Sequence, residues 1–195
     1  MNLFYFFKKF LHSREYTKEK SFVVLRDTDI FSDENLIPKD NNSWVSRPTG
    51  KVILINANNE IALIGNRVHD FFMLPGGGIN EDETIEEGLI RECLEETGYI
   101  VSLTSYVGHT ESFRNRNSRY STTYCYTAQP ISFQGQSLTD SEKEIGVYVK
   151  WIPLDEVLAL FTQQKKLILE NNIPFYNTCF NSIRDLHFVR KILKN

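Results

Sequence analysis

Residues 76–99 read GGGINEDETIEEGLIRECLEETGY, three glycines followed by a segment rich in acidic residues. Thr84 and Glu87 have the spacing of a capping box, in which each residue satisfies a free backbone N–H of the other at the start of a helix. Gly98 stands where a helix commonly ends in a left-handed residue. The stretch therefore predicts a helix over residues 85–97.

The predicted helix has one apolar side and one acidic side. Its apolar stripe would let it lie on a sheet and consists of Leu89, Ile90, Cys93 and Leu94. On the acidic side, Gly88 lies one turn before the carboxylates. Because glycine has no side chain, we expect this position to leave room for a metal ion or a phosphate.

Three glutamates share the acidic side. Each helical residue advances about 100° around the axis, so Glu92, Glu95 and Glu96 fall within an arc of about 100°. Like charges at these spacings repel by a few tenths of a kcal/mol per pair, roughly 0.2–0.5, and no basic residue falls within the arc. Mg²⁺ binds carboxylate oxygens and shares its remaining positions with water and substrate phosphates. The arc therefore predicts a metal and phosphate site.

The same stretch resembles the Nudix hydrolase signature at every fixed polar position. The matching residues are Gly77, Glu83, Arg91, Glu92, Glu95, Glu96 and Gly98. Two hydrophobic positions are relaxed, with Cys93 and Tyr99 where the family more often has an aliphatic residue. The resemblance covers about residues 45–162 and implies an α/β fold, an α/β/α sandwich with a mixed β-sheet.

The resemblance also implies roles for individual residues. Glu92, Glu95 and Glu96, with the backbone carbonyl of Gly77, would bind one or more Mg²⁺ or Mn²⁺ ions. Glu83 and Arg91 would form an ion pair that fixes the loop against the helix, since a guanidinium gives a carboxylate a defined orientation. The implied reaction is attack of water on one phosphorus of a pyrophosphate group that joins a nucleoside to some other group.

A general base for that reaction is sought among carboxylates near the predicted metals. Glu142 and Glu144 lie in the segment DSEKEIG, a predicted turn before the strand that ends at Trp151. We favour Glu144, because in similar proteins an acidic turn before this strand often faces the metals. Glu95 itself and Glu111 are the other candidates.

Substrate contacts are expected from basic and aromatic residues. Arg114, Arg116 and Arg119 lie in SFRNRNSRY, and guanidinium groups suit phosphate recognition. We expect one of the three to contact the substrate, and Arg67 is a further candidate. Aromatic candidates for stacking on a base are Phe72, Tyr120 and Trp44, of which Phe72 is equally suited to the core.

Elsewhere the chain alternates strand and turn patterns. Residues 51–57 and 60–65 are expected to form a hairpin about Asn58 and Asn59, and residues 27–42 a loop. Further strands are expected at 21–26, 71–74, 101–109, 119–127 and 145–151. Helices are expected from 154 to 161 and over 182–193, where apolar residues recur at helical spacing. We divide the chain into an N-terminal extension 1–44, a Nudix domain 45–162 and a helical C-terminal extension 163–195.

Composition excludes several functions. The net charge of −3 gives no footprint for general nucleic-acid binding. The cysteines Cys93, Cys125 and Cys179 lack the spacing of a zinc site or a disulfide framework. Residues 1–20 are aromatic-rich with a possible helix, but Lys8 and Lys9 interrupt the apolar run. We therefore expect neither a signal peptide nor a membrane span, and we expect the protein to be cytoplasmic. We expect this segment to pack on the domain or on a second subunit, as in a homodimer, rather than on a membrane surface.

The leading hypothesis is a magnesium-dependent Nudix pyrophosphohydrolase acting on a nucleoside triphosphate or a related small nucleotide. ADP-ribose, nucleotide sugars and dinucleoside polyphosphates are alternative substrates. A Nudix-fold regulatory module that binds a nucleotide without cleaving it is a rival, disfavoured because Glu92, Glu95 and Glu96 are all present. RNA 5′-end processing is a third possibility, disfavoured by the absence of a basic stripe.

Overall fold

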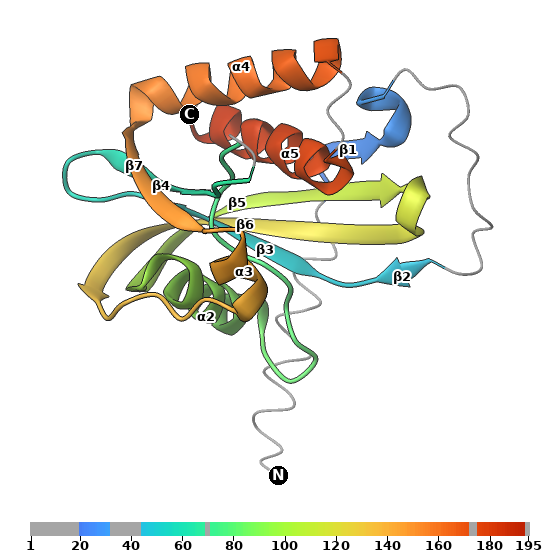
Figure 1. Ribbon diagram of the computed structural model, residues 1–195. Coiled ribbons are helices and arrows are strands. Elements are labelled where there is room, and N and C mark those ends of the chain that lie inside the picture. Colours follow the sequence, from blue (N-terminus) through green and yellow to red (C-terminus); the bar gives the residue numbers. More distant parts are fainter. Residues whose placement is uncertain (1–19, 32–43, 69–70, 172–174, 194–195) are drawn as a thin grey trace.

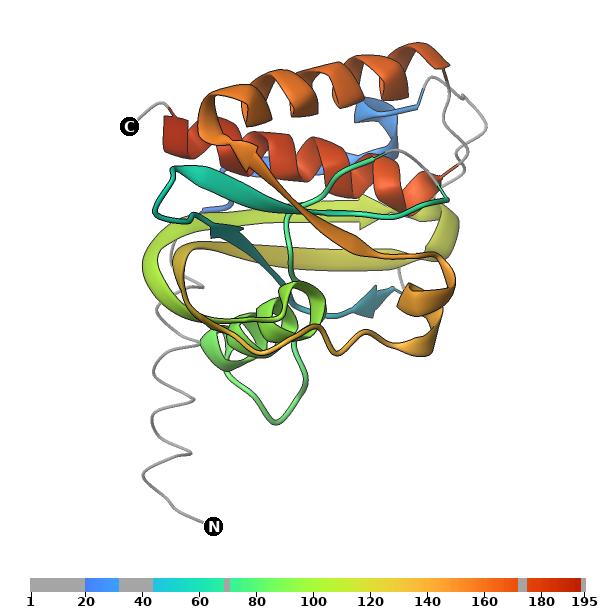
Figure 2. The same ribbon diagram turned by 60° about the vertical axis from the view of Figure 1, so that its left-hand side comes forward.

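The computed structural model describes residues 20–31, 44–68, 71–171 and 175–193. Two sheets lie between helices, with α2 on one side and α4 and α5 on the other (Figures 1 and 2). Hydrophobic clusters fill the space on both sides of the sheets. This is the predicted α/β/α sandwich. The N-terminal helix expected within residues 1–20 and most of the loop expected at 27–42 lie outside the described residues, and so does the expected dimer contact.

The larger sheet is mixed. Its long central strands β5 and β6 are antiparallel, and β1, β2 and β3 pair with them in parallel. The strand bounds are β1 Val23–Arg26, β2 Val45–Ser46, β3 Thr49–Leu54, β5 Tyr99–Arg114 and β6 Arg119–Phe133. The smaller sheet is an antiparallel pair, β4 Glu60–Gly65 with β7 Tyr148–Pro153. Short 3-10 turns occupy Asp27–Asp29 and Asn115–Asn117.

The expected hairpin at 51–65 is wrong in its pairing, although its turn is correct. The chain does reverse at Asn59, which has a positive φ of 61°. β3 then pairs with β6 and β4 with β7, and only an isolated bridge joins Ile55 to Ile61. Turn residues indicate that the chain reverses its direction locally. They do not indicate which strand, distant in the sequence, each of the two segments pairs with.

The helix α2, Ile85–Thr97, has the predicted bounds and caps. Thr84 Oγ1 accepts from the Glu87 N–H at 3.2 Å, and the Glu87 carboxylate accepts from the Thr84 N–H at 2.8 Å. Gly98 has a φ of 78° and ends the helix. The buried stripe is narrower than predicted, because Leu89 is fully buried against the sheet whereas Ile90 is 37% exposed.

The remaining helices extend beyond the predictions. α3, Asp140–Glu144, is a short helix where a turn was expected, and its start is stabilised by a capping box between Thr139 and Glu142. α4, Leu154–Asn171, and α5, Tyr176–Leu193, are each longer than the apolar pattern indicated. α4 runs on through residue 162, where we predicted the domain to end. No helix among the described residues is both long enough and apolar enough to cross a membrane.

Residues 71–74 do not form the expected strand, since only an isolated bridge joins Met73 to Ile64. Side chains from the C-terminal helices satisfy the backbone there instead. Gln164 accepts from the Phe72 N–H at 2.7 Å and donates to the Phe72 carbonyl at 3.0 Å, while Asp185 accepts from the Leu74 N–H at 2.9 Å. α4 and α5 therefore fix the approach to the glycine turn, which we define as Gly76, Gly77 and Gly78.

The packing of α2 gives the first prediction. Leu89→Ala should lower the free energy of unfolding by about 2–5 kcal/mol, because it leaves a cavity in a fully buried position. Ile90→Ala, on the exposed side of the same helix, should cost less than about 1 kcal/mol. Urea denaturation of the two variants measures both values, and equal losses would contradict this orientation of α2.

Candidate active site

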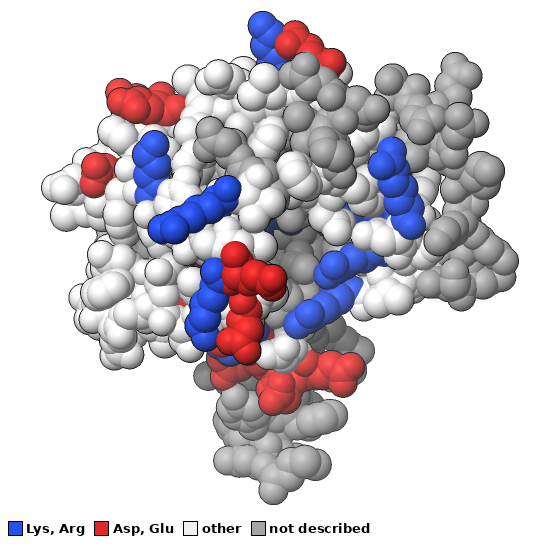
Figure 3. All heavy atoms as spheres, in the orientation of Figure 1, with Lys and Arg blue, Asp and Glu red and all other residues white. Residues whose placement is uncertain are grey.

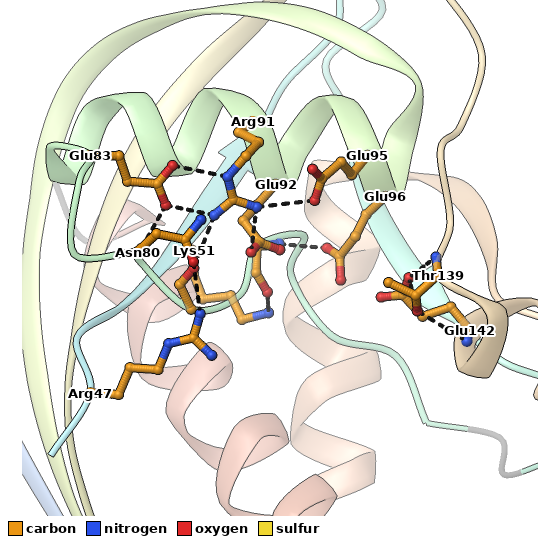
Figure 4. Close-up of polar contacts among 12 residues, drawn as sticks. Arg47, Lys51, Asn80, Glu83, Arg91, Glu92, Glu95, Glu96, Thr139 and Glu142 are labelled. Atoms are coloured by element: carbon orange, nitrogen blue, oxygen red, sulfur yellow. Dashed lines mark hydrogen bonds and ion pairs between the residues drawn. The ribbon is translucent and has the colours of Figure 1, made fainter. Parts of the chain in front are cut away.

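Arg91 is the centre of the site. Its Nε donates to Glu83 Oε2 at 2.9 Å and its Nη2 donates to Glu83 Oε1 at 2.6 Å, a bidentate pair (Figure 4). Nη2 also donates to the Gly78 carbonyl at 3.1 Å. The ion pair implied by the family resemblance is thus present. These hydrogen bonds, which Arg91 donates and Glu83 accepts, lower the pKa of the Glu83 carboxyl and raise the pKa of Arg91.

The expectation that no basic group approaches the acidic arc is wrong. Arg91 Nη1 donates to Glu92 Oε1 at 2.9 Å and to Glu95 Oε2 at 3.0 Å. A helical wheel places a residue by its Cα direction alone. An arginine side chain is long enough to reach across to the neighbouring side of the helix, so the same guanidinium binds three carboxylates.

Glu96 points away from Arg91 and toward the glycine turn. Its Oε2 accepts from the Gly76 N–H at 2.6 Å. Burial raises the pKa of Glu96 to about 7, and the nearby Lys51 ammonium and the bond from Gly76 act in the opposite direction. Lys51 donates to the Leu74 carbonyl at 2.8 Å and to the Gly76 carbonyl.

Lys51 was not among the residues singled out from the sequence. It is 7% exposed, and burial lowers the pKa of its ammonium. The signal that could have found it is a lone charged residue at the start of the apolar run KVILI, where a solvated lysine would interrupt a buried strand.

The glycine turn is held tightly against α2. A Cβ on Gly77 would lie 2.3 Å from Glu92 Oε2, so a larger residue there would displace the Glu92 carboxylate. The Gly77 carbonyl accepts from the Gly50 N–H at 2.9 Å. Gly88 is also close-packed, since a Cβ would lie 2.6 Å from Ile79 and 2.8 Å from Glu83. The expected free space for a ligand at Gly88 is therefore wrong, because the loop before the helix fills it.

Charge and donor type at this site suit a hard divalent cation. Four carboxylates share two cationic groups; they are Glu83, Glu92, Glu95 and Glu96, with Arg91 and Lys51. When all are ionised, two negative charges remain, which is the deficit that Mg²⁺ or Mn²⁺ would balance. In the described part of the chain, however, no three acidic, histidine or cysteine side chains stand close enough to hold one ion. Glu92 and Glu95 would have to exchange a bond to Arg91 for one to a metal.

The two favoured candidates for the general base differ in position. The Glu142 carboxylate accepts from the Thr139 N–H and Oγ1, each at 2.7 Å, and its charge contributes to the raised pKa of Glu96. It lies across from Glu95 and Glu96 in Figure 4. Glu144 is exposed at the end of α3. Glu111, the weaker candidate, accepts from the Tyr120 hydroxyl at 2.9 Å.

The candidate substrate contacts fall into two groups. Arg114 and Arg119 line one cavity beside the glycine turn. Arg116 instead stacks on Phe31 and Tyr176, at 4.8 and 5.0 Å from the ring centroids.

The other candidates lie outside the lining of that cavity. Arg67 packs its stem against Gly146, and Phe72 is 8% exposed in the core beside Tyr148. Trp44 packs edge-on against Phe113. The structure thus brings two of the predicted contacts together and leaves Phe72 little surface for a substrate.

Comparison with known proteins identifies the family. The model of the NUDIX domain matches residues 44–171, and the chain belongs to the Nudix family. A protein of Bacillus subtilis (strain 168), whose name suggests an 8-oxo-dGTP diphosphatase, is 29% identical over 101 residues, which are 52% of this chain and 62% of that protein. The ADP-ribose pyrophosphatase of Methanocaldococcus jannaschii is 41% identical over 58 residues, 28% of this chain and 34% of that protein.

The fold agrees with the family. The crystal structure of the MutT protein from Methanosarcina mazei Go1 superposes with a TM-score of 0.51 and 18% identity, covering 78% of this chain and 97% of that one. At this identity the likeness concerns the fold alone.

The Glu83 and Arg91 pair gives a pH-dependent prediction. Because the pKa of Glu83 is lowered in the folded protein, the pair stabilises the fold above the ordinary glutamate pKa of about 4.3 and loses this effect as the pH falls through the lower folded value. At pH 7, Glu83→Gln should lower the free energy of unfolding by about 1–2 kcal/mol. The difference from wild type should shrink below about pH 4.

Glu156→Gln is the matched control, since Glu156 is exposed on α4. It should match wild type within about 0.5 kcal/mol at either pH. A loss for Glu83→Gln that stays constant from pH 7 to pH 3 would contradict the electrostatic origin of the effect.

Proposed function

We propose that this protein is a divalent-metal-dependent pyrophosphohydrolase that cleaves the diphosphate linkage of a nucleoside diphosphate derivative such as a nucleoside triphosphate. The observation that carries the proposal is the group of three carboxylates on one side of α2, held beside a glycine turn with unbalanced negative charge. Membership of the Nudix family supports it, and so do the diphosphatase and pyrophosphatase names of the two relatives.

Glu92, Glu95 and Glu96 would hold Mg²⁺ or Mn²⁺, with the carbonyl of Gly77 as a further oxygen donor. A bound divalent ion lowers the pKa of a coordinated water and neutralises charge on phosphate oxygens. Arg91 would orient two of these carboxylates, since one of its nitrogens contacts both. The Glu83 pair in turn fixes Arg91, so the loop and the helix move together.

Glu142 is our candidate for the group that takes the proton from the attacking water. Its carboxylate is already oriented by Thr139 and its charge acts on Glu96. A general base must reach the water it activates, and a fixed carboxylate opposite the proposed metal ligands meets that need better than an exposed one at the end of α3.

The proposed activity is tested with a panel of nucleoside triphosphates, nucleotide sugars, ADP-ribose and dinucleoside polyphosphates in Mg²⁺, scoring released phosphate, pyrophosphate or nucleoside monophosphate. Glu95→Gln and Glu96→Gln should each lower kcat by about 100-fold or more, since changes even to outer partners of metal sites cost 10–100-fold. EDTA should abolish turnover. Glu156→Gln should match wild type. Unchanged turnover in Glu95→Gln or Glu96→Gln would refute the proposed role of the residue that was changed.

The choice of base gives a separate prediction. Glu142→Gln should lower kcat by about 10²- to 10⁴-fold, the usual contribution of general base catalysis. Mn²⁺ binding, followed by paramagnetic resonance, should persist, which separates a lost base from a lost metal ligand. Glu144→Gln removes the same charge two residues away and should turn over like wild type. The opposite pattern would transfer the role to Glu144.

A further inference from the structure

A cavity of about 200 Å³ lies beside the glycine turn, on the side covered by α5. Every residue that lines it is polar or a glycine. Four of them are basic and come from three strands and a helix; they are Lys51, Arg114, Arg119 and Arg184. Two amides from α5, Asn177 and Asn181, complete the wall. We call this cavity the basic pocket.

Two of the four basic residues form no ion pair with any residue that the structure describes. Arg184 lies 2.8 Å from the buried carboxylate of Asp185, and Lys51 lies near Glu96. None of the ion pairs among the described residues includes Arg114 or Arg119. The basic pocket therefore carries an excess of two positive charges.

Arg114 is unusual because it is 5% exposed and yet forms no ion pair with a described residue. Its Nη1 and Nη2 donate only to the neutral amides of Asn177 and Asn181, at 3.0 and 2.8 Å, and its buried Nε makes no hydrogen bond. Burial, with Arg184 and Arg119 nearby, lowers the pKa of Arg114 to about 9. A buried guanidinium is stabilised by a paired anion, and the structure supplies the donors for one.

The lining decides which part of a nucleotide suits this place. Whole drug-sized ligands occupy pockets of roughly 300–1,000 Å³ with mostly apolar and aromatic walls. The basic pocket is smaller, and no aromatic side chain of the described residues lines it, so a base would find nothing to stack on. A phosphate group is small, and two guanidinium groups match its charge and geometry.

We infer that the basic pocket binds the terminal phosphate of the substrate, and that the substrate class is nucleotides ending in a free phosphate rather than nucleotide sugars. The glycine turn borders the pocket, and its Gly76 N–H donates to the Glu96 carboxylate on α2. A phosphate chain could therefore extend from the pocket to the carboxylates of α2. In Figure 3, acidic side chains gather over α3 and the loop before α2, with basic side chains beside them toward β2. That this phosphate belongs to a substrate rests on the function proposed above, whereas the affinity of the pocket for phosphate does not.

Binding is tested without metal and without turnover, by titration calorimetry of inorganic pyrophosphate into the full chain in EDTA at low salt. Wild type should bind saturably. Arg119→Gln should weaken binding about tenfold, since one charge-assisted bond is lost. Asn177→Asp should weaken it similarly, because its carboxylate would neutralise Arg114. Asn177 is exposed in the first turn of α5, where a carboxylate favours the helix, so the variant should fold.

Arg190→Gln is the matched control. Like Arg119→Gln it replaces an arginine by glutamine, but Arg190 lies on α5 outside the lining of the pocket. Its Kd for pyrophosphate should be within twofold of the wild-type value. The inference is overturned if wild type fails to bind pyrophosphate, or if Arg119→Gln and Arg190→Gln bind it equally.

Substrate class is tested by kcat/KM in Mg²⁺ for a nucleoside triphosphate and a nucleotide sugar with the same base. The triphosphate should be preferred, and Arg119→Gln should lower its kcat/KM about tenfold while leaving the sugar within twofold. Pyrophosphate should compete with the triphosphate and raise its KM. Preference for the sugar, or non-competitive inhibition, would overturn the inference. If the protein binds pyrophosphate but cleaves no nucleotide, the proposed function is wrong and the assignment of the basic pocket to phosphate binding is kept.

Discussion

The site depends on the reach of one guanidinium. Arg91 binds Glu83 through two nitrogens, and its remaining bonds go to the Gly78 carbonyl, Glu92 and Glu95. These contacts tie the glycine turn and the loop before α2 to the helix itself. Without them the Glu92 carboxylate would repel those of Glu95 and Glu96, three and four positions further along the helix. Arg91 therefore allows Glu83, Glu92 and Glu95 to lie close together without a metal ion.

What the sequence predicted well is local. The bounds of α2 follow from Thr84, Glu87 and Gly98, whose capping chemistry involves residues within a turn of each helix end, and the shared side of the glutamates follows from helical geometry. What it missed is non-local. Residues 71–74 are held by Gln164 and Asp185, about ninety or more positions away, and no pattern in that segment indicates such partners. The long reach of Arg91 was missed for another reason, since a wheel records directions and not side-chain lengths.

Lys51 shows how topology builds a site. It reaches the glycine turn because β3 leaves its sequence neighbour β4 and pairs with β6, which places its start beside Leu74 and Gly76. A local hairpin, as the turn residues indicated, gives no reason to place it there. The ammonium binds backbone carbonyls and faces both the carboxylates and the basic pocket. It is thus fixed at the boundary between the two charged regions.

The C-terminal helix α5 lies outside the part of the chain that matches the family. The match to the Nudix domain covers residues 44–171 and so includes α2 and the glycine turn, whereas α5 begins at Tyr176. The residues proposed to hold metal are therefore in the part shared with the family, and Asn177, Asn181 and Arg184 of the basic pocket are outside it. Because the same helix also anchors residues 71–74 through Asp185, a displacement of α5 would also displace the approach to the glycine turn. The proposed phosphate pocket and the proposed metal-binding carboxylates are consequently coupled in position through the buried side chain of Asp185.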